Sequence, residues 1–478
     1  MADVVTRFAP SPTGFMHIGG VRTALFAYLW ARKNKGTFIL RIEDTDKERE
    51  VAGSIEHIQE SLKWLGLDWD YGPDTQNPWG SAIQSQRLDT YRVAAQTLID
   101  KGFAYPDPYS SEEIDGFRKE AQANKRVFLF RDHRPKEFSA WDGKRSLRFK
   151  VPTIKRMEWH DEVRGALSAG EEALDDFILI KADGYPTYNF AHIVDDMNMN
   201  VTHVMRGDEF ISSTPKFLSL YEALEIPVPK FVTLPPILRE DKTKKLGKRD
   251  GAKDLLEYRT EGYLPDAMVN FLALIGWNPG TEQEFFSHEE LIQQFDISGI
   301  QTHGGIFNEE KLRWFNREYL QKLSVDTLET ETLRVLSVAV SNYDERIAKR
   351  VVPLIRERIS VWDDIPTMVA DGELAFFFST PNLDAKLIPE KKTSPEDTKA
   401  HLAYIHKRLQ DVPEADFNVE TVKNALWDYA TEKGRGSVLW PLRYALSGQE
   451  RSPDPFIIAG IVGKDETLSR VTHAIEML

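Results

Sequence analysis

The chain has 478 residues, a formal net charge of −14 and no cysteine. The absence of cysteine excludes disulfides, thiolate zinc sites and a cysteine nucleophile, and the acidic balance argues against a protein that coats nucleic acid non-specifically. No apolar run approaches the ~20 residues that a membrane span needs, and the first residues lack the basic-then-apolar pattern of a signal peptide. We therefore expect a cytoplasmic protein that binds no membrane.

The N-terminal segment has the pattern of a strand, a loop, a helix and a second strand. The apolar pair Val4–Val5 leads into a proline- and glycine-rich loop at 7–20, an amphipathic helix begins at about Gly19–Gly20, and a strand follows at 37–42. Free N–H groups at the start of such a helix bind anions such as phosphate, and His17 could donate to the same anion. An ordinary strand-to-helix turn is the alternative.

The composition changes between residues 103 and 175. Loops rich in glycine, proline and aromatic residues alternate with basic pieces, and the stretches 146–151 and 158–163 alternate in polarity as strands do. We interpret this segment as an insertion between two halves of a parallel sheet. A lid or a purely decorative insertion would have the same composition.

The parallel sheet is expected to resume at Phe177–Ile180, because an unbroken apolar run bounded by charges is typical of a strand buried on both faces. A helix through Ile193 and Met197, a strand at 201–206, a helix at 217–224 and a strand at 231–234 follow. Together with the first half they predict a doubly wound sheet, in which ligands bind at the carboxyl ends of the strands.

The rest of the chain begins with a basic segment at 241–252, and the sequence becomes almost wholly helical beyond Glu309. Helical apolar spacing marks further segments, which are 264–274, 311–320, 325–340, 345–358, 395–409 and 419–431. The pattern alone does not distinguish an RNA-binding helical region from one that contacts other proteins.

Two short segments resemble the signature motifs of class I aminoacyl-tRNA synthetases. His-Ile-Gly-Gly at 17–20 resembles H-I-G-H, and Lys-Leu-Gly-Lys-Arg at 245–249 resembles K-M-S-K-S. Longer stretches, dense as far as about Tyr319, are similar in sequence and order to glutamyl-tRNA synthetases of the bacterial type. These stretches are 7–20, 41–46, 183–190, 206–209 and 262–267.

The resemblance implies an α/β fold with a doubly wound, Rossmann-like catalytic domain that is split by an α+β insertion and followed by an all-α anticodon-binding part. It implies ATP-dependent attachment of L-glutamate to tRNA-Glu through a glutamyl-adenylate, with Mg²⁺ on the phosphates, no zinc and a monomeric enzyme. The implied segments are catalytic halves at 1–102 and 176–240, an acceptor-end-binding insertion at 103–175, a stem-contact region at 241–318 and an anticodon-binding region at 319–478.

The resemblance also assigns roles to individual residues. It implies that Arg206 takes the side-chain carboxylate of glutamate with Arg7 and Tyr188 beside it, while Glu43 and Ser11 hold the ammonium group. Each arginine could instead form a structural ion pair with a nearby acid such as Asp208 or Asp44. The implied catalytic residues are His17, Lys245 and Lys248. ATP would be bound by these three and by Pro10, Gly19, Gly20, Glu209 and Leu246.

Three positions depart from the family pattern or lack a family expectation. Gly20 replaces the second histidine of the first motif, Gly247 replaces the serine of the second, and His192 near the amino-acid pocket has no assigned role. Arg358 matches a position that reads the last anticodon base, which favours strict recognition of tRNA-Glu. The alternatives are an enzyme that also charges tRNA-Gln and a non-catalytic tRNA-binding paralogue, although intact His17 and the two lysines argue against the latter.

Overall fold

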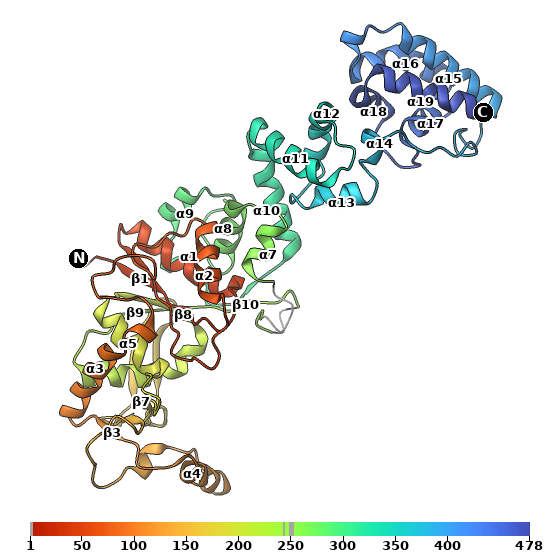
Figure 1. The fold of residues 1–478 in the computed structure, drawn as a ribbon. Helices are drawn as coiled ribbons and strands as arrows, with labels where there is room; N and C mark the ends of the chain where they lie inside the picture. Colours follow the sequence, from red (N-terminus) through yellow and green to blue (C-terminus); the bar gives the residue numbers. More distant parts are fainter. Residues whose placement is uncertain (1–2, 242–243, 248–252) are drawn as a thin grey trace. The chain divides into compact units, whose positions relative to one another are not determined.

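The structure is a computed structural model that describes residues 3–241, 244–247 and 253–478. The chain forms two compact units, which are residues 1–260 with 264–312, and residues 261–263 with 313–478. The sheets belong to the first unit, and the described part of the second unit contains helices and no strand (Figure 1). The predicted α/β fold with a helical C-terminal part is therefore confirmed.

The main sheet has six strands in the order β2-β1-β8-β9-β5-β6. The first five are parallel to their neighbours, and β6 is antiparallel to β5. Because β1 and β8 are parallel neighbours, the ends of both strands lie at the same edge. The strands are β1 (Val5–Phe8), β2 (Thr37–Leu40), β5 (Met157–Asp161), β6 (Gly165–Ala169), β8 (His203–Gly207) and β9 (Lys230–Leu234).

Strand β1 lies further along the chain than its sequence predicts, because its polar residues are buried. Thr6 is fully buried and its hydroxyl donates to the Ala27 carbonyl at 2.8 Å. An apolar run therefore marks only the beginning of this strand. Helix α1 (Ile18–Lys33) then returns the chain to β2. Gly36 permits that return, since a Cβ there would lie 2.0 Å from the Val4 carbonyl oxygen.

Helices cover the sheet in two groups. Helix α1 packs against α8 and α9, while α3, α5 and α6 contribute to a core cluster that also contains residues of β8 and β9. Most residues of α1 are buried, as expected for a helix that lies between a sheet and other helices. The helices of this unit are α2 (Ser54–Trp64), α3 (Leu88–Asp100), α4 (Ser111–Ala123), α5 (Tyr188–Asn198), α6 (Thr214–Leu224), α7 (Leu255–Thr260), α8 (Pro265–Leu274) and α9 (His288–Gln294).

The structure corrects two strand assignments. The run at Phe177–Ile180 was expected to resume the parallel sheet, but β7 (Ile178–Ile180) belongs to a separate antiparallel sheet with β3 (Ala104–Pro106) and β4 (Leu147–Phe149). An apolar run shows that a strand is buried, and it does not show which sheet the strand joins. One core cluster packs against both sheets, so either location would bury β7.

Strand β5 was expected inside the insertion, but it extends the main sheet beside β9. Asp161 at its end fixes the junction, because its carboxylate accepts hydrogen bonds from the Thr233 hydroxyl at 2.6 Å and the Thr233 N–H at 3.3 Å. The hairpin β5–β6 is thus the outer edge of the main sheet.

Residues 244–246, which are described residues of the basic segment at 241–252, pair with β10 (Ile237–Leu238), and β10 forms a small parallel pair with β11 (Gly305–Ile306). Backbone hydrogen bonds join the Arg239 N–H to the Lys244 carbonyl at 3.0 Å and the Leu246 N–H to the Ile237 carbonyl at 2.8 Å. Residues 244–246 therefore run back along β10.

The second unit confirms the predicted helices, and its described part contains five more that the sequence did not reveal, α13, α14, α17, α18 and α19. Helix α17 contains Pro441 in its interior, and α18 is short and apolar throughout, so neither has a clear helical pattern. The division of the chain between the two units falls within α10. The helices are α10 (Glu309–Lys322), α11 (Val325–Ala339), α12 (Glu345–Arg356), α13 (Asp364–Ala370), α14 (Ala375–Phe378), α15 (Pro395–Gln410), α16 (Val419–Lys433), α17 (Arg435–Ser447), α18 (Pro455–Val462) and α19 (Lys464–Met477).

Candidate active site

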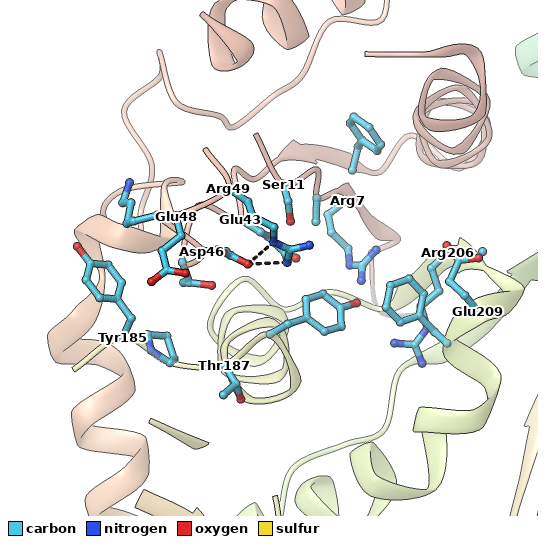
Figure 2. A pocket seen from close by; sticks show the side chains of 18 of the residues that line it. Arg7, Ser11, Glu43, Asp46, Glu48, Arg49, Tyr185, Thr187, Arg206 and Glu209 are labelled. Carbon is cyan, nitrogen blue, oxygen red and sulfur yellow. Dashed lines mark hydrogen bonds and ion pairs between the residues drawn. The ribbon is translucent and has the colours of Figure 1, made fainter. Parts of the chain in front are cut away.

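A cavity of about 820 Å³ opens where β1 and β8 end and α5 begins. Glu209 and all five side chains predicted to bind glutamate line it. Figure 2 shows that Arg7, Ser11 and Glu43 come from the segment before the insertion, whereas Arg206 and Glu209 come from the segment after it. The topology therefore brings together the residues that the sequence analysis selected from distant segments.

The guanidinium group of Arg206 is enclosed by aromatic rings. Its Cζ lies 5.3, 4.8 and 5.2 Å from the ring centroids of Phe210, Phe217 and Phe231, and Nη2 donates to the Thr214 hydroxyl at 3.2 Å. Nη1 is buried without a hydrogen-bond partner, and burial lowers the pKa of Arg206. No carboxylate of the described residues forms an ion pair with this side chain. A carboxylate ligand would supply both the missing acceptor and the missing charge.

Arg7, by contrast, forms the structural ion pair that the sequence left as an alternative. Its Nε donates to Asp196 Oδ1 at 3.1 Å and its Nη1 to the Met205 carbonyl at 3.3 Å. Burial would raise the pKa of Asp196, but Arg41 and Arg7 outweigh it and lower the value to about 2. Arg7 still lines the cavity, so its fixed guanidinium can serve a ligand as well.

The anionic side of the cavity is Glu43, which follows β2. Its Oε1 accepts hydrogen bonds from Arg41 Nη2 at 2.9 Å and Nε at 3.3 Å. Burial raises the pKa of Glu43 to about 7, although Arg41 and Arg7 oppose the shift. A bound ammonium group would favour the ionised form and restore a low pKa.

His192 contacts Tyr188, which lies one turn earlier in α5. The two rings stack with centroids 4.6 Å apart, and His192 Nδ1 lies 2.6 Å from the Tyr188 carbonyl oxygen. Burial lowers the pKa of His192 to about 3, so the ring is neutral and donates Nδ1–H to that carbonyl. Burial also raises the pKa of Tyr188 to about 12, which keeps its phenol protonated as a donor. His192 therefore supports Tyr188 from behind.

The first signature motif begins helix α1. His17 is the N-cap residue, and its Nδ1 accepts from the Gly19 N–H at 3.1 Å, so a neutral ring carries its proton on Nε2. A Cβ at Gly19 would lie 2.9 Å from His17 Cε1, whereas at Gly20 it would meet only Phe8 at 3.8 Å. Glycine is thus needed at position 19 to accommodate the imidazole, and the fold leaves room for a side chain at position 20.

Among the described residues of the second signature motif, Lys245 contacts a residue that lines the cavity. Lys245 Nζ donates to Glu209 Oε2 at 2.8 Å. Partial burial would raise the pKa of Glu209, but this hydrogen bond, the charge of Lys245 and a backbone hydrogen bond together outweigh it and hold the value below the usual one. Lys248 lies outside the described residues, and its predicted role stays a prediction. Six of the described residues that were predicted to bind ATP do not line this cavity, namely Pro10, His17, Gly19, Gly20, Lys245 and Leu246.

Sequence reasoning missed the residues that hold the pocket side chains in place, chiefly Arg41 and Asp196. Arg41 stands in one of the stretches that carry the resemblance, and the acidic pair Asp195–Asp196 follows an apolar helical run. Charged residues are rarely buried in a helix unless they are paired. The position of these two acidic residues on a predicted helix was therefore the signal that the sequence offered. Several charged residues at the outer part of the cavity were also missed, namely Asp46, Lys47, Glu48, Arg49 and Lys181.

Arg358 lies in the second unit, after helix α12, which ends at Arg356 rather than at the predicted position 358. Its guanidinium forms an ion pair with Glu373, and both side chains remain partly exposed. Its predicted role in reading the anticodon stays a prediction.

Comparison with known proteins extends over the whole chain. Residues 3–314 match the family model "tRNA synthetases class I (E and Q), catalytic domain", and residues 310–475 match "Anticodon binding domain". A glutamate--tRNA ligase of Clostridium acetobutylicum is 40% identical over 100% of this chain and 99% of its own length. The chain belongs to the class I glutamate--tRNA ligases. A glutamate--tRNA ligase of Anaeromyxobacter sp. is 38% identical, over 99% of this chain and 98% of its own.

A solved glutamate--tRNA ligase gives the same fold. The crystal structure of the enzyme from Elizabethkingia meningosepticum, in complex with its amino acid, is 36% identical, has a TM-score of 0.89 and covers 99% of each chain. The structure from Elizabethkingia anophelis has a TM-score of 0.86 at 36% identity, covering 99% of this chain and 100% of its own.

Two further findings concern the described part of this glutamate--tRNA ligase family member, residues 3–241, 244–247 and 253–478. No helix there is both long and apolar enough to cross a membrane. No group of three or more histidine, aspartate or glutamate side chains there is arranged to hold a metal ion.

Proposed function

We propose that this protein attaches L-glutamate to tRNA-Glu in two steps, with ATP as the energy source. Family membership over the full length supports the reaction class. In the first step a carboxylate oxygen of glutamate attacks the α-phosphorus of ATP, forming glutamyl-adenylate and releasing pyrophosphate. In the second step the 2′-hydroxyl of the terminal adenosine attacks the glutamyl carbonyl and AMP leaves.

The observation that carries the choice of amino acid is the buried Arg206 guanidinium, whose Nη1 has no partner. An acidic side chain satisfies this nitrogen, whereas a neutral amide presents one acceptor oxygen and no charge. Arg7 adds a second cation, and Tyr188 adds a phenol donor. Glu43 and Ser11 line the same cavity and supply acceptors for the α-ammonium group. The pocket thus matches a dicarboxylate amino acid in charge.

ATP is expected beside this pocket, at the start of α1. The helix N-terminus and the Nε2–H of His17 offer donors to a phosphate. Lys245 donates a hydrogen bond to Glu209, which lines the cavity. Lys248 would neutralise charge that builds on the α-phosphate during attack. Because the described residues offer no metal cage, Mg²⁺ would be held chiefly by the phosphates themselves, where it would shield their charge.

The test is attachment of radiolabelled glutamate by the purified protein, with ATP and Mg²⁺, to separate transcripts of tRNA-Glu and tRNA-Gln. Charging of tRNA-Glu alone supports the proposal with strict recognition, and charging of both supports an enzyme that also accepts tRNA-Gln. Charging of neither transcript, together with no glutamate-dependent exchange of pyrophosphate into ATP, would refute the proposal. Glutamine and aspartate serve as control amino acids.

A further inference from the structure

Two buried residues connect the cationic and anionic sides of the glutamate pocket. Asp196 Oδ1 accepts hydrogen bonds from Arg7 Nε at 3.1 Å and from Arg41 Nη1 at 2.6 Å. Arg41 in turn donates to Glu43 Oε1 at 2.9 Å. All four side chains are at most 4% exposed, so this network, Arg7–Asp196–Arg41–Glu43, is continuous and shielded from solvent.

We propose that Asp196 and Arg41 are positioning residues for amino-acid activation, and that they set the separation and orientation of the Arg7 guanidinium and the Glu43 carboxylate that receive the substrate. The inference rests on the proposed function, because it assigns those two groups to glutamate. Neither Asp196 nor Arg41 lines the cavity, so both act through their neighbours.

Stability alone does not explain this arrangement. Asp196 Oδ2 is buried and has no hydrogen-bond partner, and an unsatisfied buried oxygen on a carboxylate is destabilising. Arg41 is fully buried, and well-packed apolar residues commonly replace such buried pairs without loss of stability. The geometry does explain the arrangement, because one carboxylate oxygen shared by two guanidinium groups fixes their relative position.

The network is also balanced in charge. Two guanidinium groups face two carboxylates, so these four residues carry no net charge when Glu43 is ionised. When Asp196 loses its charge, Arg7 loses its anchoring partner, whereas Arg41 keeps its hydrogen bonds to Glu43. The same substitution should therefore disorder the carboxylate-binding side and strengthen ionisation on the ammonium-binding side.

Asp195 provides a matched control on the same helix. It is fully buried and accepts from Gln84 Nε2 at 2.8 Å, Arg87 Nε at 2.8 Å and the Tyr91 hydroxyl at 2.9 Å. It approaches Arg41 only to 3.8 Å and has no contact with Arg7 in the described structure. Its substitution removes a buried, ion-paired carboxylate without releasing Arg7.

The experiment compares Asp196→Asn with Asp195→Asn in the full-length protein, by glutamate-dependent pyrophosphate exchange and by thermal unfolding. We expect Asp196→Asn to raise the KM for glutamate by about tenfold or more and to change the KM for ATP by less than about threefold. Asp195→Asn should lower the Tm to a similar or greater extent with little change in either KM. Equal effects of the two substitutions on the glutamate KM would overturn the inference.

A second readout separates positioning from a structural role. The charge of Asp196 is one of the factors that raise the pKa of Glu43. The pH below which the KM for glutamate begins to rise should therefore be lower in Asp196→Asn and unchanged in Asp195→Asn. An unchanged pH in Asp196→Asn contradicts the proposed network. If Asp196→Asn does not fold, Asp196→Glu takes its place: the charge is kept but displaced, and an unchanged glutamate KM would refute the inference. Lack of exchange activity in the unmodified protein would instead refute the proposed function.

Discussion

At the scale of single residues, the pocket combines side chains whose burial is unfavourable unless a ligand is bound. Arg206 illustrates this, since three aromatic rings surround a guanidinium group with an unsatisfied nitrogen. Such a group discriminates strongly, because any ligand that lacks the complementary oxygen leaves it unpaired.

Substitution of Arg206 should therefore act on one substrate. We expect Arg206→Ala to raise the KM for glutamate by about a hundredfold or more and to leave the KM for ATP nearly unchanged. Arg206→Lys keeps the charge and should recover part of the affinity. Both constants are measured by pyrophosphate exchange. An equal loss of affinity for glutamate and ATP would indicate that Arg206 has a structural role.

The raised pKa of Glu43, about 7, predicts a pH dependence of glutamate binding. If the α-ammonium group of glutamate binds the ionised form of Glu43, as proposed, the KM for glutamate should rise about tenfold for each pH unit below that value. Above it the KM should be constant until the substrate itself loses its proton. Glu43→Gln should raise the KM at pH 8 and abolish its dependence on pH between 5 and 7. A sloping profile in Glu43→Gln would assign the titration to another group.

The same shift has a consequence for stability. A carboxyl group with a raised pKa holds its proton more tightly in the folded state, so its contribution to the free energy of unfolding falls as the pH rises from 4.5 to about 7. Asp196, whose pKa is lowered to about 2, contributes in the opposite sense: its stabilisation is complete above its usual pKa of 3.8 and is lost as the pH falls towards 2.

At the scale of elements, residues 244–246 are held by backbone pairing along β10 and by the contact between Lys245 and Glu209. Both side chains are about half exposed, so their ion pair should add little to stability. A functional role for Lys245 therefore predicts a loss of activity without a loss of folding.

We expect Lys245→Ala to slow adenylate formation by about a hundredfold and to shift the Tm by no more than about 1 °C. The neighbouring exposed residue gives the matched control, since Lys244→Ala removes the same charge from the same segment and should retain most of the rate. Single-turnover formation of glutamyl-adenylate measures the effect. Similar rates in both variants would exclude a specific role for Lys245.

The sheet shows why part of the fold was predictable. The first βαβ unit and the strands at β8 and β9 were found because they combine buried apolar strands with an amphipathic helix. The assignments of β7 and β5 were wrong because a strand's own sequence reports its burial and says little about its neighbours. The polar residue that fixes β5, Asp161, resembles any charged strand end until Thr233 is seen beside it.

The candidate site was predictable to a similar extent. Residues that line the cavity were found through the resemblance, because their types and order match one family. Arg41 and Asp196 were missed because their proposed role depends on a contact between the residue after β2 and a residue of α5, which are 155 residues apart in the chain. The residues that line a pocket can be found from a sequence by resemblance to a family, whereas the buried residues that hold them in place are found only in the structure.

At the scale of the whole molecule, an acidic protein must bind a polyanion. With a net charge of −14, association with tRNA must rest on local basic surfaces and should weaken as salt rises. We expect the KM for tRNA-Glu to increase at least about tenfold between 50 and 200 mM KCl, while pyrophosphate exchange changes by less than about twofold. Parallel loss of both activities would point to an effect of salt on the fold.

The hairpin β5–β6 places the edge of the main sheet within the insertion. Strand β9 would otherwise end the parallel sheet with unpaired N–H and C=O groups, a surface that invites pairing with another chain. The insertion thus returns to the sheet that it interrupts and makes the partly exposed strand β6 its edge in place of the buried strand β9. A shortened chain lacking residues 107–175 would expose the edge of β9, and it should form intermolecular sheet and aggregate even if the proposed glutamate pocket itself were preserved.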